Sequence, residues 1–161
     1  MTVFAGGIIN AADLNRLDPA PLVEISLASS SGAISSETVI LTLGSATYLA
    51  NSAYEAILEG GYSMSVSTNV PLLTLRKTNV AGTIVGNFGP RLPAPGTTSS
   101  TAIYTSVMFQ IGASDFTGVV CATASASAGT VTITGNGQRQ ARLRIHYRGA
   151  ASAWSNLPTL S

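Results

Sequence analysis

The residues best placed to do chemistry form an alternating row near the C-terminal end of the sequence. Residues 140–148 read Q-A-R-L-R-I-H-Y-R, which places at every second position Arg142, Arg144, His146 and Arg148. Alternate side chains of a β-strand point to the same face. The sequence therefore predicts a strand whose polar face carries three guanidiniums and the single histidine of the chain. Such a row either pairs with counter-charges or stands in water.

A catalytic role for this row lacks the partners that it requires. A hydrolytic triad needs a histidine beside a nucleophile and an orienting acid, whereas His146 stands between arginines that disfavour its protonated form. Glu55 and Glu59 are the closest carboxylate pair, and on a strand they lie about 13 Å apart, beyond the usual glycosidase separations. On a helix they would be near neighbours. With one histidine, one cysteine and scattered acids, we expect no enzyme, no metal site and no cofactor.

Charge is scarce and unevenly distributed. The 161 residues hold eight basic and seven acidic side chains, a net charge of +1 that gives no case for nucleic-acid binding. Residues 1–75 carry a net charge of −5 and residues 76–161 a net charge of +6. These charges balance within one subunit, or acidic and basic faces meet between subunits. The candidates for a subunit interface are Glu55, Glu59, Arg142, Arg144, Arg148 and Trp154.

The lone Cys121 lies in the apolar run V-V-C-A-T, so the sequence predicts a buried structural thiol and no internal disulfide. The first ten residues lack the basic and apolar regions of a secretory signal. No run approaches the roughly 18–20 apolar residues of a membrane helix. We therefore expect synthesis in the cytoplasm without membrane insertion.

Residues 1–21 are expected to form an N-terminal arm with one short helix. Asn10 can cap the first helical turn, Leu14 and Leu17 share one face, and Pro19 ends the helix. A helix of one or two turns is unstable alone, so it must dock on another surface.

The body of the chain alternates as short strands. They are expected at 23–28, 37–43, about 54–59, 62–66, 72–78, 82–85, 103–111, 116–122, 131–134 and 140–148. Segment 45–59 is ambiguous between helix and strand, and a strand from Tyr54 is favoured. A tight turn at 135–137 predicts a hairpin that joins the last two strands.

This count favours an all-β fold, an antiparallel jelly-roll β-sandwich of about 8–10 strands spanning residues 22–149. Residues 150–161 would form a C-terminal tail, in which the single Trp154 most often pins the tail to the body and less often contacts a neighbouring subunit.

Residues 87–100 contain three prolines and two glycines, which predicts a long exposed loop. Phe88, Arg91 and Leu92 make this loop a candidate for receptor or carbohydrate recognition. Phe88 is its single aromatic, which counts against a sugar site.

Two parts of the sequence resemble structural proteins of tailed-phage virions, particularly phages of actinobacteria. The opening G-G-I-I-N-A-A-D-L-N-R-L-D-P resembles their short N-terminal motif. The body resembles their jelly-roll domain through Y-E-A-I-L-E-G-G-Y, L-L-T-L-R-K-T-N-V-A-G-T-I-V-G and A-R-L-R-I-H-Y-R-G. One departure is the basic Tyr147-Arg148-Gly149, where such proteins often carry an acidic residue and then G-P.

The resemblance implies a head-decoration or minor tail protein with a tumour-necrosis-factor-like domain, which commonly forms a homotrimer. It implies a virion location, major capsid or tail proteins as partners, and no catalytic residues. The arm would anchor the protein to the particle through Phe4, Ile8, Ile9, Leu14 and Leu17. A receptor- or carbohydrate-binding tip that contacts the host cell surface is the alternative. Position on head, tail or fibre stays open.

Overall fold

The computed structural model describes residues 21–66, 71–88 and 101–161. These residues form twelve strands and two short 3₁₀ helices. In chain order they are β1 (Val23–Ser26), β2 (Thr38–Thr42), β3 (Ala46–Tyr48), β4 (Ser52–Met64), β5 (Pro71–Lys77), β6 (Ile84–Asn87), β7 (Thr101–Ile111), β8 (Phe116–Gly118), β9 (Val120–Ala126), β10 (Val131–Ile133), η1 (Gly137–Arg139), β11 (Arg142–Ala150), η2 (Ala151–Ala153) and β12 (Thr159–Leu160).

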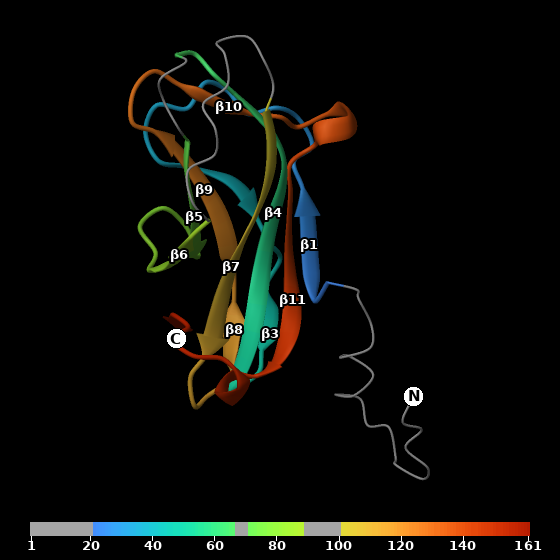
Figure 1. Cartoon of the computed structure of the whole chain (residues 1–161), viewed down its shortest axis with the longest axis vertical. Coiled ribbons are helices and arrows are strands. Elements are labelled where there is room, and N and C mark those ends of the chain that lie inside the picture. The colour runs from blue at the N-terminus through green and yellow to red at the C-terminus, as the bar shows by residue number, and fades with distance from the viewer. Residues whose placement is uncertain (1–20, 67–70, 89–100) are drawn as a thin grey trace.

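Two layers of strands form the body, as Figure 1 shows. The larger sheet has the order β1-β11-β4-β7-β12, with β10 also paired to β4, and the smaller has the order β2-β9-β5-β6. Strands β3 and β8 form a separate pair. Every connection except β5 to β6 passes from one sheet to the other among the eight strands β1, β2, β4, β5, β6, β7, β9 and β11. This connectivity confirms the predicted antiparallel jelly-roll sandwich.

The long strand β4 resolves the ambiguity of segment 45–59 in favour of strand. It begins at Ser52, two residues before the predicted start, and continues without interruption through Gly60 to Met64. Its inward side chains include Tyr54, Leu58 and Tyr62, each at most 1% exposed. Because β4 lies between β11 and β7, its outward residues occupy the middle of the sheet's outer face.

The core lies between the inner faces of the two sheets. Near the β3–β8 pair it contains a group of aromatic rings. Tyr48 contacts Tyr54 edge-on and stacks on Phe116, and Tyr54 in turn stacks on Phe109. Tyr147 of β11 meets the edge of Tyr54, which fixes the arginine strand to the core. This packing explains why the strand buries one face while its other face stays polar.

The predicted hairpin between the last two strands is wrong. Val131 of β10 lies opposite Met64, and Arg142 of β11 lies opposite Glu59 farther along the same strand. Both segments are therefore neighbours of β4 rather than of each other. The eight residues between them fold outward around η1. A tight hairpin turn would have reversed the chain, whereas here the chain continues along β4.

Trp154 does not hold the tail as predicted, because its side chain is 44% exposed. The segment is fixed by β12, which pairs in parallel with the end of β7 and buries Leu160. Gln110 adds a side-chain bond to the hydroxyl of Thr159. Backbone pairing and an aliphatic anchor thus replace the expected aromatic contact.

The recognition-loop prediction is wrong for Phe88, which is 4% exposed and belongs to the core. Its backbone N–H donates to the carbonyl of Leu73, so the β5–β6 pairing extends to it and turns the ring inward. Arg91 and Leu92 lie outside the described residues, as do the arm and its anchoring candidates Phe4, Ile8, Ile9, Leu14 and Leu17. In the part of the chain that the structure describes, no helix is long and apolar enough to cross a membrane.

Candidate functional site

The arginine strand has the two faces that its alternation predicted. Leu143 and Ile145 are fully buried, whereas Arg142 and Arg144 lie on the outer face and are half-buried. The intervening Tyr147 points to the opposite face, toward the core. The row is therefore a surface feature of the larger sheet, and its chemistry depends on what the neighbouring strands supply.

The neighbouring strands supply carboxylates. In the cross-strand register Arg142 faces Glu59 of β4, and Arg144 faces Glu24 of β1. Nη2 of Arg144 lies 2.6 Å from Oε2 of Glu59. Nε of Arg142 lies 3.3 Å from Oε1 of Glu24.

The same pattern repeats at the far end of the strand, where Nε of Arg148 donates to Oε2 of Glu55 at 2.8 Å. All three arginines of the row thus have an acidic partner inside the same chain. These ion pairs are intramolecular, as in the first of the two interpretations that the sequence left open.

His146 lies in this row opposite Glu55. Burial lowers the pKa of its imidazole, and the positive charges of Arg148 and Arg144 lower it further, against weaker opposing effects of Glu55 and Glu24. The ring is therefore uncharged at neutral pH and is a weaker base than a free imidazole. No group of three or more His, Cys, Asp or Glu side chains suited to a metal ion occurs within the described residues.

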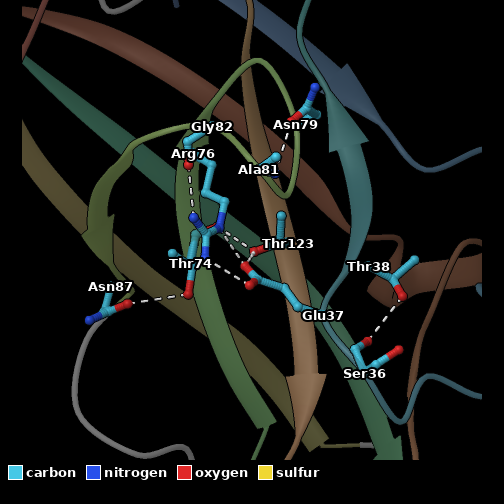
Figure 2. Close-up of polar contacts among 10 residues, drawn as sticks. All are labelled: Ser36, Glu37, Thr38, Thr74, Arg76, Asn79, Ala81, Gly82, Asn87 and Thr123. Carbon is cyan, nitrogen blue, oxygen red and sulfur yellow. Dashed lines mark hydrogen bonds and ion pairs between the residues drawn. The ribbon is translucent and has the colours of Figure 1, made fainter.

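The smaller sheet carries a second polar cluster on its outer face, shown in Figure 2. Glu37, just before β2, reaches across β9 and binds Arg76 of β5 through both carboxylate oxygens, at 2.6 and 2.7 Å. The hydroxyl of Thr123 on β9 donates to the same carboxylate at 2.6 Å. The guanidinium also donates to the carbonyl of Gly82 in the β5–β6 turn at 2.8 Å.

This cluster joins three strands and a turn, and its groups are well satisfied. The hydrogen bonds from Arg76 and Thr123 hold the pKa of Glu37 below its ordinary value of 4.5, although burial opposes them. Cys121 lies opposite Arg76 and is fully buried, as predicted. Burial raises the pKa of its thiol. We infer that this cluster of Glu37, Arg76 and Thr123 stabilises the smaller sheet, and we call it the brace.

Several large apolar side chains remain exposed beside these charged faces. Leu72 of β5 and Ile84 of β6 are both more than half exposed, and Val80 in the turn between them is also exposed. Trp154, directly after η2, is an exposed aromatic side chain. None of these was singled out from sequence except Trp154, because strand alternation alone does not reveal which face stays uncovered.

The most exposed of the large hydrophobic side chains is Tyr104 of β7, at 75%. It lies at one side of an open groove of about 440 Å³. The groove crosses the outer face of the larger sheet and ends at η1. Its lining is Glu59, Gly60, Ala102, Ile103, Tyr104, Gly137, Gln138, Arg139, Gln140 and Arg142. The sequence pointed to Glu59 and Arg142 but to neither Tyr104 nor the η1 residues.

No protein-family model and no curated protein matches the sequence. Among solved structures, that of the Gx strain of infectious bursal disease virus is similar to this chain. The two have 15% sequence identity and a TM-score of 0.45, and the match covers 82% of this chain and 37% of that one. The VP2 subviral particle of the same virus has 15% identity and a TM-score of 0.43, over 82% and 38%.

A carbohydrate-binding module from Cellvibrio mixtus lichenase 5A, in complex with cellotriose, has 16% identity and a TM-score of 0.39, over 79% of this chain and 98% of that one. This chain spans little more than a third of the viral proteins' length. Likenesses this distant carry no argument about function, which is therefore argued below from this chain's own residues.

Proposed function

We propose that this chain is a structural protein of a tailed-phage virion that assembles as a homotrimer on the capsid or tail surface. The observation that carries the proposal is a jelly-roll domain directly following a sequence that resembles a phage particle-anchoring motif. In this proposal residues 1–21 attach to major capsid or tail proteins, and the sandwich projects from the particle.

The surface chemistry is consistent with a scaffold rather than an enzyme. The arginines of the larger sheet's outer face form ion pairs with Glu24, Glu55 and Glu59 of the same chain, and burial and neighbouring arginines lower the pKa of His146. Leu72 and Ile84 are separate exposed apolar side chains on the smaller sheet that a second copy could cover. Burying such side chains between subunits stabilises an oligomer by about 25 cal/mol for each Å² of apolar surface removed from water.

The paired charges are weaker interface candidates than the sequence suggested. Glu55, Glu59, Arg142, Arg144 and Arg148 would each have to keep or exchange an existing partner on binding a second copy. Removing a charge from its partner leaves an uncompensated charge behind, which costs free energy. The exposed Trp154 has no such constraint and stays an interface candidate in this proposal.

The test separates attachment from assembly. Light scattering of the full chain should give the mass of three copies, and a chain lacking residues 1–19 should keep that mass but fail to join particles. A monomer in solution would contradict the trimer, and full incorporation of the shortened chain would contradict the anchor.

Leu72→Ser with Ile84→Ser should lower the oligomer mass if the smaller sheet is the interface, while Ser106→Thr, on the larger sheet, serves as the matched control.

A further inference from the structure

The groove beside Tyr104 contains a row of three chemically different side chains. Tyr104 of β7 lies opposite Glu59 of β4, and Glu59 lies opposite Arg142 of β11. Figure 1 shows these three strands side by side, with the orange coil of η1 near the start of β11. Directly opposed residues on neighbouring strands have Cβ atoms roughly 5 Å apart. An aromatic ring, a carboxylate and a guanidinium therefore line up across about 10 Å of surface.

Two of these groups have hydrogen-bonding capacity that the fold does not use. Glu59 accepts from Arg144 through Oε2, whereas its Oε1 lies 3.8 Å from Nη1 of Arg142, too far for a hydrogen bond. Arg142 donates through Nε to the hydroxyl of Ser26. Its terminal nitrogens donate to no acceptor among the described residues at hydrogen-bonding distance. A carboxylate oxygen and a guanidinium nitrogen thus face the groove together.

A hydroxyl group suits this pair of atoms. An oxygen about 2.8 Å from both atoms can donate its proton to Oε1 and accept a hydrogen from Nη1. Adjacent hydroxyls would use the remaining nitrogen of the same guanidinium. Because the pair carries opposite charges, it favours neither a simple anion nor a simple cation, while Arg139 adds a second positive charge to the lining.

The exposed ring supplies the apolar half of the site. Most of Tyr104 is in water, although its β7 neighbour Ile103 is buried, so the ring is a surface platform rather than part of the core. An aromatic face beside a few polar groups matches a ligand with one apolar face and a polar rim. A pyranose ring has that character, with C–H groups on one face and hydroxyls around its edge.

The far wall of the groove is held by backbone packing. At Gly60 a Cβ would lie 2.5 Å from Cα of Ala141, so glycine is required for the chain after η1 to pack this closely on β4. The side chain of Gln140 is fixed by its bond to the carbonyl of Leu27. Gln138 on η1 adds an exposed amide, which can both donate and accept. The groove is thus a built feature of the fold.

We propose that this groove binds a pyranose unit of a saccharide. The sugar ring stacks on Tyr104, adjacent hydroxyls bind Glu59 and Arg142, and the amide of Gln138 contacts its far side. This inference does not depend on the virion role proposed above, since the groove needs only the folded sandwich.

The experiment uses ¹⁵N-labelled full-length protein and titrates it with methyl glucoside, galactoside and mannoside, N-acetylglucosamine, glucuronate and, as the anion control, acetate. At least one pyranoside should shift the backbone amides of residues 59–60, 103–105 and 137–142 at millimolar concentration. Absence of shifts with every sugar overturns the proposal, as do shifts confined to other residues. Equal shifts with acetate and glucuronate, and none with the neutral sugars, would identify an anion site and overturn it too.

Variants then test the named contacts. Tyr104→Ala should weaken the binding about tenfold, the equivalent of one lost stacking contact, whereas Tyr104→Phe should bind nearly as well. Because Tyr104 is exposed, both variants should fold. Glu59→Gln should also weaken binding, and unchanged affinity in Tyr104→Ala would overturn the proposal. Particle incorporation of Tyr104→Ala, measured in parallel, distinguishes failure of this site from failure of the virion role.

Discussion

Arg144 and Glu59 are 85 residues apart in the sequence, yet Nη2 of the arginine lies 2.6 Å from Oε2 of the glutamate. Each side chain is about one quarter exposed, so water only partly screens the pair. Arg142 lies close to the same carboxylate and to Glu24, which makes the group a small network rather than an isolated pair. The network ties β1, β11 and β4 together across the outer face of the larger sheet.

We expect the charge network to contribute modestly to stability. A double-mutant cycle of Arg144→Ala and Glu59→Ala should give a coupling of about 1 kcal/mol, the upper end for exposed pairs, in urea unfolding at low salt. The coupling should shrink as salt is added. A coupling near zero would mean that this ion pair does not contribute to stability.

Charge reversal should have a larger effect than deletion. Arg142→Glu with Arg144→Glu would place like charges beside Glu24 and Glu59, and should lower the free energy of unfolding more than the two alanine substitutions do. Adding Glu59→Arg should restore part of the loss. Unchanged stability in the protein with both arginines reversed would mean that the arginine row is a solvated face whose ion pairs do not stabilise the fold.

The brace on the smaller sheet should be stronger than the surface network. Glu37→Gln removes the charge that binds Arg76 through two hydrogen bonds, and we expect a loss of about 1–2 kcal/mol in the free energy of unfolding. Thr123→Val should lose less, since it removes one donor to the same carboxylate. Thr38→Val, whose hydroxyl binds only a nearby backbone carbonyl, is the control and should be nearly neutral.

Stability should fall in acid in two steps with different causes. The pKa of His146 is lower in the folded chain than its ordinary value of 6.5, so below that pH the unfolded chain takes up the proton more readily. The contribution of neutral His146 to the free energy of unfolding is complete above pH 6.5. It is lost as the pH falls toward the pKa of His146 in the folded chain. The pKa of Glu37 is also lowered, so its contribution holds above 4.5 and is lost below it.

Thermal unfolding followed between pH 7 and pH 3 tests both steps. His146→Gln should flatten the profile just below pH 6.5 and leave the lower step in place. Glu37→Gln should flatten the profile below pH 4.5 and leave the upper step in place. If His146→Gln leaves the upper part of the profile unchanged, the histidine is not the titrating group.

Gly60 should be the least replaceable glycine of the larger sheet. Its φ of +143° disfavours other residues, and an added Cβ would meet the backbone of Ala141. Gly60→Ala should therefore cost about 2–3 kcal/mol by forcing β4 and the following loop apart. Gly32→Ala, at a site with open space around it, should change stability by less than about 0.5 kcal/mol. Equal effects of the two substitutions would contradict the close approach.

Much of the fold could be predicted because alternation reports local structure directly. The period-two pattern around Leu143 and Ile145 identified the arginine strand and its buried face, and proline and glycine positions identified most of the turns. The charge division between the halves predicted that acidic and basic side chains pair, but it did not predict that Arg144 pairs with Glu59. These features need only local spacing and electrostatics.

The errors share a physical cause, which is that pairing and exposure depend on residues far away in the sequence. The turn-like G-N-G at 135–137 predicted a hairpin, but β4 is long enough to pair with both β10 and β11. Phe88 follows a strand and is drawn into the core, while Tyr104 sits outside because nothing among the described residues covers its side of β7. Local polarity could not distinguish these two aromatic residues.

The order of strands along the chain also has a consequence for how the protein folds. Glu55 and Glu59 are synthesised with β4, but the arginines that neutralise them arrive only with β11, near the end of the described chain. Long-range pairing of this kind makes folding slow, and a partly made sheet exposes both edges of β4 until β7 and β11 are added. If the arginine strand docks last, its ion pairs are absent from the folding transition state. Removing them should then accelerate unfolding while leaving the folding rate nearly unchanged, which stopped-flow measurements of both rates would reveal.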